Sequence, residues 1–234
     1  MNTPFCSVLI PTRGRASLQA AIESFLRTAD NPSAVEIVVR IHDDDPDSLA
    51  WAASRDRVRH GAPIRVIVGD TGDGYGSMHE FVASLCAASR GSWLWPSSDD
   101  WRSLTKGWDT KLAARCPNPL DTPLVLSSTV PGRRLCLISR GLYHAVGHIG
   151  LTEHQDTYLF ALADLAAIHE TIDIDLEDSG LPEVGPRDRP KTWEQFRSAA
   201  TAKRFNTDKL KLAAVLGRPI VSTWTTSDAP TGIT

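Results

Sequence analysis

Cysteine is scarce and scattered in this chain of 234 residues, which contains only four. The four lie far apart, without any Cys-x-x-Cys pair, at Cys6, Cys86, Cys116 and Cys136. Structural zinc sites need clustered thiolates, so this spacing argues against one. Reduced, buried thiols in a cytoplasm are the expected state of these side chains.

Long apolar runs are also missing. A membrane-spanning helix needs roughly 20 consecutive apolar residues, and the sequence has no stretch of that kind. The opening residues, MNTPFCSVLIPTRGR, lack a basic region before their short apolar run. We therefore expect no signal peptide, no membrane partner and a cytoplasmic location.

Neither sign of charge dominates the whole chain, whose formal net charge is −3 at pH 7. Residues 187–218, however, carry nine Lys and Arg against three acids, whereas residues 1–186 carry 16 against 24. We predict one main domain over residues 1–186 and a basic helical extension with a mobile tail over 187–234. The basic segment is either the solvated face of helices or a surface that attracts a polyanion.

Strand-like and helix-like segments alternate in the first hundred residues. Apolar runs predict strands within residues 6–11, 35–48, 64–70 and 92–100, and helical periodicity predicts helices over 16–30, 48–61 and 78–91. This alternation predicts an α/β domain with a Rossmann-type, mostly parallel sheet flanked by helices. Later segments predict helices over 104–116 and 152–170, with Thr152 as a cap, and strand-like pieces over 122–129 and 133–147.

Polar residues follow each of the four predicted strands. They are Thr12 and Arg13, then Asp43 to Asp45, then Asp70, and finally the pair Asp99 and Asp100 in WLWPSSDDW. An aspartate pair beside tryptophans is costly unless a cation or hydrogen bonds compensate it. Because ligands of parallel sheets bind outside the carboxyl ends of the strands, we expect a site at this edge.

The order of these segments resembles that of GT-A-fold, family-2-like glycosyltransferases. The likeness is carried by SVLIPTRGR, IHDDDPDS, GYGSMHEFVASLCAASRGSWLW, SSDDW and GHIGLTEHQDTYL, and it covers roughly Cys6–Glu170. No single motif is specific to this family, and the likeness is carried by the order and spacing of the motifs. The resemblance implies transfer of a sugar from a nucleotide-sugar, usually a UDP-sugar, to an acceptor hydroxyl.

The resemblance also implies a donor-binding set. It consists of Pro11, Thr12, Arg13, Arg15, Asp43, Asp44, Asp45, Tyr75 and Asp99. Arg15 would reach a phosphate, Tyr75 would stack on the base or sugar, and one acid, with Asp44 as first choice, would contact uracil or ribose. Solvated surface turns are the alternative for the arginines and for the three adjacent acids.

A metal site follows from the same resemblance, because the family binds a divalent metal through an Asp-x-Asp-type motif. In this register the first acid falls on Ser98 and the last on Asp100. We expect Asp100 to bind Mn²⁺ or Mg²⁺, which prefer carboxylate oxygens, with Asp99 as second ligand or as a contact to donor hydroxyls. A weak or absent metal requirement, or a plain acidic strand end, stays open, and Asp178 or His169 would be the third ligand.

One carboxylate deprotonates the acceptor in an inverting transferase. The resemblance places this base in HQDTY, at Asp156, with Glu153 as the substitute. An acid at a helix start is also favoured by the helix dipole alone.

The acceptor is open at this point. The basic segment is compatible with a hydroxymethylated base in double-stranded DNA, by analogy with small phage-type transferases, which would work in the host cytoplasm. Protein, lipid-linked and small-molecule acceptors are the alternatives. Two other classes also stay open: a nucleotidyltransferase, whose Gly-rich signature PTRGRAS fits poorly, and a non-catalytic nucleotide- or glycan-binding module.

Overall fold

The computed structural model describes residues 3–13, 17–53, 58–72, 77–130, 135–150, 154–178 and 194–221. The strands of its large sheet are β1 (Cys6–Pro11), β2 (Val35–His42), β3 (Val58–Arg59), β4 (Ala62–Gly69), β5 (Trp93–Pro96), β7 (Val125–Ser128), β8 (Leu137–Ser139) and β9 (His169–Ile172). A smaller sheet contains β6 (Trp101–Ser103) and β10 (Leu176–Asp178). The helices are α1 (Ser17–Thr28), α2 (Pro46–Ala53), α3 (Met78–Ala88), α4 (Trp108–Arg115), α5 (Arg140–Val146), α6 (Gln155–Leu165) and α8 (Ala199–Leu216), with a 3-10 turn at Pro32–Ala34.

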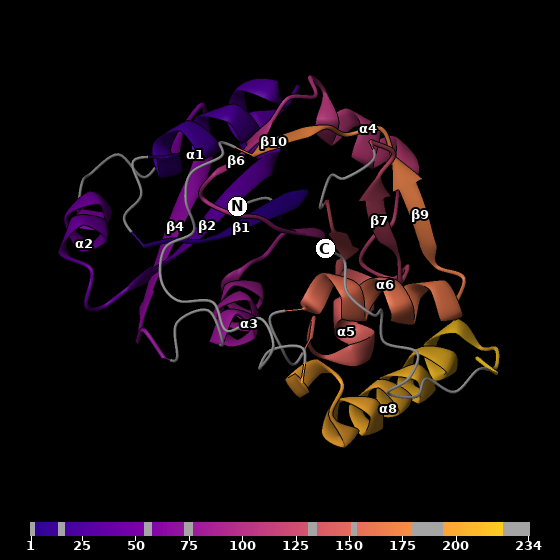
Figure 1. Cartoon of the computed structure of the whole chain (residues 1–234). Coiled ribbons are helices and arrows are strands. Elements are labelled where there is room, and N and C mark those ends of the chain that lie inside the picture. The colour runs from indigo at the N-terminus through magenta and orange to yellow at the C-terminus, as the bar shows by residue number, and fades with distance from the viewer. Residues whose placement is uncertain are drawn as a thin grey trace.

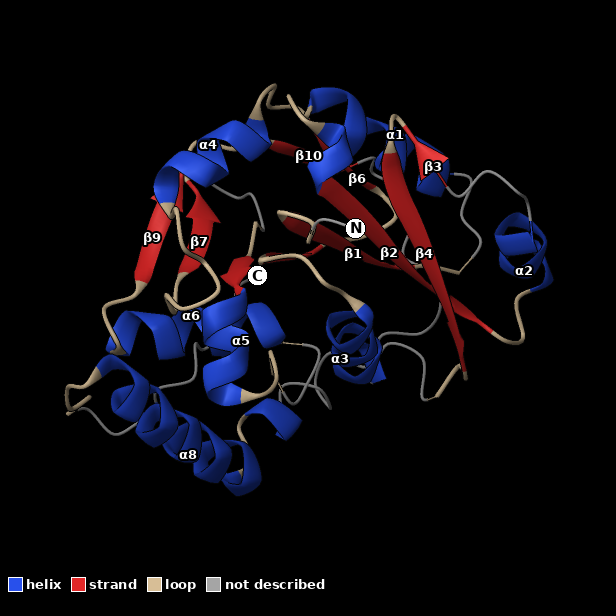
Figure 2. Cartoon of the chain, turned by 180° about the vertical axis from the view of Figure 1, so that it is seen from behind, coloured by secondary structure: helices blue, strands red, loops and turns tan. Residues whose placement is uncertain are grey.

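The large sheet has a parallel half and a mixed half. Its order over the described residues is β3-β4-β2-β1-β5-β8-β7-β9. Strand β1 pairs in parallel with β2 and β5, and β2 pairs in parallel with β4. Strand β8 runs antiparallel to β5 and β7, while β9 is parallel to β7. The predicted α/β architecture, a mostly parallel sheet between helices, is confirmed (Figures 1 and 2).

Two apolar layers hold the helices to the sheet. Helices α1 and α4 cover one face, and α3, α5 and α6 cover the other (Figure 1). Under α1, the Trp95 ring packs edge-on against Phe25 and Trp108, with ring centroids 5.0 Å apart in each case. The Trp108 indole N–H also donates to the carbonyl of Phe25 at 2.9 Å. The tryptophan that leads into the aspartate pair is therefore a core residue, and its neighbourhood is rigid.

Helix α8 forms an outer layer over α5 and α6 (Figures 1 and 2). Its inward side chains Phe205 and Leu212 are fully buried in the same apolar cluster as α6 residues Leu159 and Leu162. The C-terminal helix is thus part of the packed core of the second face. The boundary proposed at residues 186/187 lies outside the described residues.

Three predicted elements differ from the structure. The strand-like piece at 133–147 contains helix α5, which begins because the Ser139 hydroxyl caps it by accepting from the Leu142 N–H at 3.2 Å. The helix expected over 152–170 ends at Leu165, because Ala167 adopts a left-handed φ of 51° and turns the chain into β9. The helix expected over 48–61 ends at Ala53, and a turn at His60 and Gly61, both with positive φ, joins β3 to β4.

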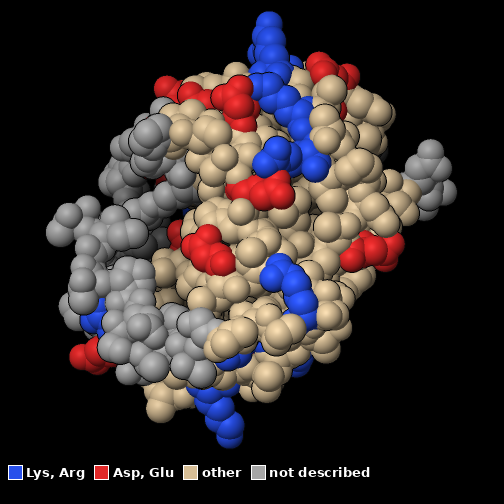
Figure 3. Space-filling view, turned by 90° about the vertical axis from the view of Figure 1, so that its right-hand side faces the viewer, with Lys and Arg blue, Asp and Glu red and all other residues tan. Residues whose placement is uncertain are grey.

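Charged side chains of both signs are interspersed on the face that carries α4 and β9 (Figure 3). Lys111 donates to Asp173 at 2.6 Å, and Arg115 pairs with Glu170 at 2.5 Å. Exposed pairs of this kind contribute little to stability, typically under about 1 kcal/mol.

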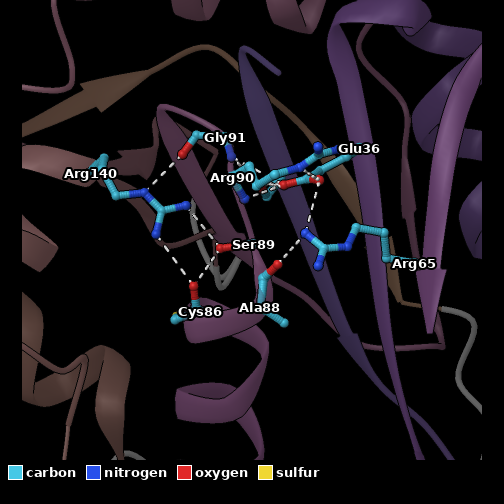
Figure 4. Close-up of polar contacts among 9 residues, drawn as sticks. Glu36, Arg65, Cys86, Ala88, Ser89, Arg90, Gly91 and Arg140 are labelled. Carbon is cyan, nitrogen blue, oxygen red and sulfur yellow. Dashed lines mark hydrogen bonds and ion pairs between the residues drawn. The ribbon is translucent and has the colours of Figure 1, made fainter. Parts of the chain in front are cut away.

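A buried carboxylate stands out at the amino-terminal edge of the parallel strands (Figure 4). Glu36 of β2 is wholly buried, and it accepts hydrogen bonds from the Ser7 hydroxyl at 2.6 Å and from the Gly91 N–H at 3.1 Å. The Arg90 N–H also donates to it, and the Arg90 and Arg65 side chains lie 3.5 and 4.0 Å from its second oxygen. The charge is therefore compensated from β1, β4 and the chain that leads into β5.

Arg140 of α5 extends this network to the end of α3 (Figure 4). Its guanidinium donates to the carbonyls of Gly91 and Cys86 at 3.0 and 3.3 Å and to the Ser89 hydroxyl at 2.9 Å. The carbonyls at a helix C-terminus lack helical partners and carry partial negative charge, which a cation stabilises. A Cβ on Gly91 would lie 2.4 Å from the Ser7 hydroxyl oxygen, so this close approach requires glycine.

Replacement of the buried carboxylate should therefore cost more than replacement of an exposed one. Glu36→Gln keeps the shape of the side chain but turns an accepting oxygen into a donor that faces other donors. We expect a loss of about 2 kcal/mol in the free energy of unfolding, measured by urea denaturation. The matched control is Glu170→Gln, which removes only an exposed pair and should cost under about 1 kcal/mol. Equal losses in the two variants would contradict a central role for Glu36.

Candidate active site

The carboxyl ends of β1, β2, β4 and β5 meet at one edge, because these strands run parallel. There the Thr12 hydroxyl donates to the Asp99 carboxylate at 2.6 Å, and both residues are only 4% exposed. The Thr12 N–H donates to the carbonyl of Arg40 at 2.9 Å. Pro11, the last residue of β1, lies opposite Arg40 in the β1–β2 register. The fold thus brings Thr12 and Asp99, 87 residues apart in the chain, into direct contact.

Asp100 is partly buried in the turn between β5 and β6. Strand β10 pairs antiparallel with β6 and places Asp178 opposite Trp101, the residue that follows Asp100. Three acids therefore belong to one turn and its neighbouring strand. Among the residues that the structure describes, no three His, Cys, Asp or Glu side chains are assembled as a metal cluster. The carboxylate oxygens of Asp99 and Asp100 suit a hard divalent cation, so their chemistry fits the expected metal.

The three acids after β2 differ in their surroundings. Asp45 caps α2, since its carboxylate accepts from the Ser48 N–H at 3.2 Å and from the Ser48 hydroxyl at 2.6 Å. Asp43 and Asp44 are exposed. An interaction with the Thr71 side chain, which follows β4, lowers the pKa of Asp44, and the charge of Arg13 acts in the same direction. Asp44 is therefore ionised.

Two residues of β2 at this edge, Arg40 and His42, are not among the site residues predicted from the sequence. Arg40 and His42 are 6% and 3% exposed, and both contact Phe81 of α3. The guanidinium carbon of Arg40 lies 4.0 Å from the ring centroid of Phe81, and the His42 ring packs edge-on at 4.9 Å. A Cβ on Gly69 would lie 2.5 Å from Arg40 Nη2, so the glycine makes room for the cation.

The signal for Arg40 and His42 is present in the sequence. In VEIVVRIH the odd-numbered residues are all apolar, whereas three of the four even-numbered residues are polar. In a strand that is covered on both faces, polar residues at every second position lie together in one buried layer. Burial lowers the pKa of His42, and the charges of Arg13 and Arg40 lower it further, so the ring is neutral near pH 7.

Asp156 lies in the first turn of α6, where its carboxylate accepts from the N–H of Thr157 at 2.8 Å. Burial raises the pKa of Cys136, and the charge of Asp156 raises it further. Cys136 lies in the same apolar cluster as Tyr158 and Leu159 of α6. Cys136 directly precedes β8, which runs antiparallel to β5, and therefore stands beside the end of β5. The start of α6 thus approaches the edge that carries the aspartate pair. Three predicted site residues, Arg15, Tyr75 and Glu153, lie outside the described residues.

His169 is engaged at both ring nitrogens. Its Nδ1 lies 2.6 Å from an Asp164 oxygen, and its Nε2 lies 2.9 Å from the Ser127 hydroxyl. The ring is also stacked on Phe160, with centroids 4.9 Å apart. These contacts account for the position of His169 without a metal. Of the two candidates for a third metal ligand, Asp178 is the one that lies next to the aspartate turn, because β10 pairs with β6.

No family model matches the chain, and no curated protein matches its sequence. Solved structures do match it, among them Staphylococcus aureus TarS, a glycosyltransferase. TarS residues 1–349 have a TM-score of 0.56 at 15% identity, with 90% of this chain and 70% of that chain covered. This chain has a GT-A-like fold.

Other TarS structures show the same GT-A-like likeness. The complex of TarS 1–349 with UDP has a TM-score of 0.58 at 15% identity, and covers 90% of this chain and 70% of that one. The complex with UDP-GlcNAc has a TM-score of 0.52 at 15% identity, with 95% and 74% covered. The longer TarS chain is covered over 43% of its length. At this level of identity the likeness is one of backbone architecture.

Because His42 is buried, the free energy of unfolding of the protein should depend on pH. In an unfolded chain histidine has a pKa of about 6.5, whereas burial lowers the pKa of His42 in the folded protein. As the pH falls from about 7 to about 5, the unfolded chain binds a proton that the folded chain refuses, so stability decreases. His42→Gln should flatten this decrease in the free energy of unfolding, measured by urea denaturation at several pH values.

The control for this measurement is His144→Gln, which replaces an exposed histidine on α5. Its pH dependence should match that of the wild type. A decrease that persists unchanged in His42→Gln would mean that His42 is not held neutral.

Proposed function

We propose that the chain is a glycosyltransferase that moves a sugar from a UDP-linked nucleotide-sugar to an acceptor hydroxyl. The observation that carries the proposal is the contact of Thr12 with Asp99, which joins two strand ends at the ligand-binding edge of a GT-A-like sheet. TarS, which shares the architecture, has been solved with UDP and with UDP-GlcNAc. The residue types at this edge match the chemistry of such a donor.

The donor would lie across the ends of β1, β2 and β4. Asp44 is ionised and would accept a hydrogen bond from the uracil N–H or from a ribose hydroxyl. Arg13, whose charge acts on Asp44 and His42, is an exposed cation that would face the pyrophosphate. Asp99 is held by the hydrogen bond from Thr12, so its carboxylate is preorganised.

Asp100 and Asp99 would hold the Mn²⁺ or Mg²⁺ of this site. When bound there, a divalent cation supplies positive charge that stabilises the leaving pyrophosphate. Asp156 would act on the acceptor side: its carboxylate takes the proton from the acceptor hydroxyl while that oxygen bonds to the anomeric carbon and the bond to UDP breaks. This single displacement inverts the configuration of the sugar.

Removal of Asp100 tests the proposal. Asp100→Ala should lower the Mn²⁺-dependent release of UDP from UDP-GlcNAc by about 100-fold or more, because several kcal/mol of charge stabilisation are lost. The melting temperature without ligand should be nearly unchanged. Asp47→Ala, which removes an exposed acid of α2, is the control and should keep wild-type turnover.

Two outcomes of this assay would favour the other classes. Release of pyrophosphate from a nucleoside triphosphate would support a nucleotidyltransferase. A rise in melting temperature with UDP and Mn²⁺, without any turnover, would support a binding module.

A hydroxymethylated base in duplex DNA is one acceptor hypothesis, and the charge balance of residues 187–218 motivates it. On α8, however, Arg204 and Lys211 pair with Asp208, and Lys209 is only 8% exposed, while Lys203 is exposed. Three of the four cations on α8 are thus paired or buried within the protein. If DNA is the acceptor, affinity must still fall with salt by a log–log slope of about −0.9 per phosphate contact. A gel-shift titration at low salt that shows no binding removes this acceptor.

A further inference from the structure

A second buried carboxylate lies between α8 and the body of the protein. Asp208 is wholly buried and shares the inward face of α8 with Phe205 and Leu212. A carboxylate among apolar side chains costs several kcal/mol unless it is hydrogen-bonded and paired. Its partners therefore show what the position is built for.

Two of these partners come from outside α8. His148 Nε2, from the connection between α5 and α6, and the Tyr158 hydroxyl, from α6, each lie 2.6 Å from the same Asp208 oxygen. Arg204 and Lys211, on α8 itself, lie 3.3 and 3.5 Å from the other oxygen. Burial alone would raise the pKa of Asp208, but the hydrogen bonds from His148 and Tyr158 lower it. Asp208 is therefore ionised, and both external groups donate to it.

The donation from His148 fixes the chain that precedes α6. The N–H of Gly150 donates to His148 Nδ1 at 3.0 Å, which leaves Nε2 to carry the ring proton toward Asp208, and Arg204 Nε, which also donates to Asp208, lies 3.1 Å from this Nε2. Gly150 has a φ of 152°, and a Cβ there would lie 2.7 Å from the Cβ of Gln155, the first residue of α6. The hydrogen bonds run from α8 through His148 to backbone that packs on the start of α6.

Tyr158 ties the same end of α6 to α8 directly. It is two residues beyond Asp156 and its ring packs edge-on against Phe205, with centroids 5.2 Å apart. A third contact joins His154, the residue before α6, to buried Phe196, with ring centroids 5.7 Å apart. The C-terminal part of the chain thus makes three contacts at or beside the start of α6, while at the other end Arg218 donates to the carbonyl of Ala166 and Asp164 pairs with its neighbour His169.

We propose that Asp208 is a positioning residue that sets the location of Asp156 by holding His148 and Tyr158. The proposal rests on the function proposed above, because it assigns to α8 the placement of the acceptor-side carboxylate. A displacement of about 1 Å in a reacting group can cost about 100-fold in rate, so a group that acts through two hydrogen bonds can control turnover without touching substrate.

The test is Asp208→Asn in the full chain, with UDP-GlcNAc and Mn²⁺ as the probe. We expect kcat for UDP release, with water as acceptor, to fall about 10- to 100-fold toward the value of Asp156→Asn. KM for UDP-GlcNAc and the Kd for UDP should stay within about 2-fold, since the proposed donor contacts come from the ends of β1, β2, β4 and β5. Asp164→Asn, at the other end of the helix, is the matched control and should keep wild-type kinetics.

Hydrogen exchange provides a readout that does not depend on activity. In Asp208→Asn the amides of residues 155–159 should exchange about 10-fold faster, while those at the C-terminal end of α6 change little. Tyr158→Phe and His148→Gln should each reproduce part of both effects, and Tyr158→Phe added to Asp208→Asn should have little further effect. These two single variants decide the question if Asp208→Asn does not fold.

Two results would overturn the proposal. Asp208→Asn could lower the melting temperature while kcat per folded molecule stays within about 2-fold of wild type, or exchange could rise equally along all of α6. Either result would make Asp208 a stabilising residue only. Failure of the proposed function is distinct, because the wild type would then not release UDP, whereas the exchange pattern would still report whether Asp208 holds the start of α6.

Discussion

The charge of Glu36 imposes the constraint on which the other parts of the fold depend. A carboxylate without solvent must collect donors, and here they come from β1, from β4 and from the backbone that enters β5. Because parallel strands are stiff and hydrogen-bonded in register, fixing their amino ends also fixes their carboxyl ends. The contact of Thr12 with Asp99 lies at the opposite edge of the same strands. Arg140 carries the same constraint across to α5, so the parallel and mixed halves of the sheet share one anchor.

The two halves of the molecule use the same device at different places. The parallel half is built around Glu36, and the layer of α5, α6 and α8 is built around Asp208; each acid is wholly buried and each gathers donors from separate segments. Directional hydrogen bonds specify one arrangement more strictly than apolar packing alone, which tolerates small slides between helices. The parallel sheet and the start of α6 are therefore each tied to a buried acid.

The sequence was most informative where structure is local. Apolar runs and helical periodicity identified β1, β2, β4, β5, α1, α3 and the existence of α6 and α8, and the strand ends identified the edge where Thr12 and Asp99 meet. It was least informative where tertiary contacts decide. A helix at Arg140–Val146 follows from a cap at Ser139 and from carbonyls of α3, which periodicity does not report. A count of charges likewise could not reveal that Arg204 and Lys211 serve Asp208, since composition does not tell where side chains point.

The pairing of β6 with β10 separates two events in the life of the chain. The strands of the parallel half are all made before β6. The turn of Asp99 and Asp100 enters β6, whose partner strand is translated only after α6 and β9. A nascent chain can thus possess the sheet edge long before it possesses the strand that completes the aspartate turn. The parallel strands and the strand that completes the aspartate turn are therefore synthesised at different times.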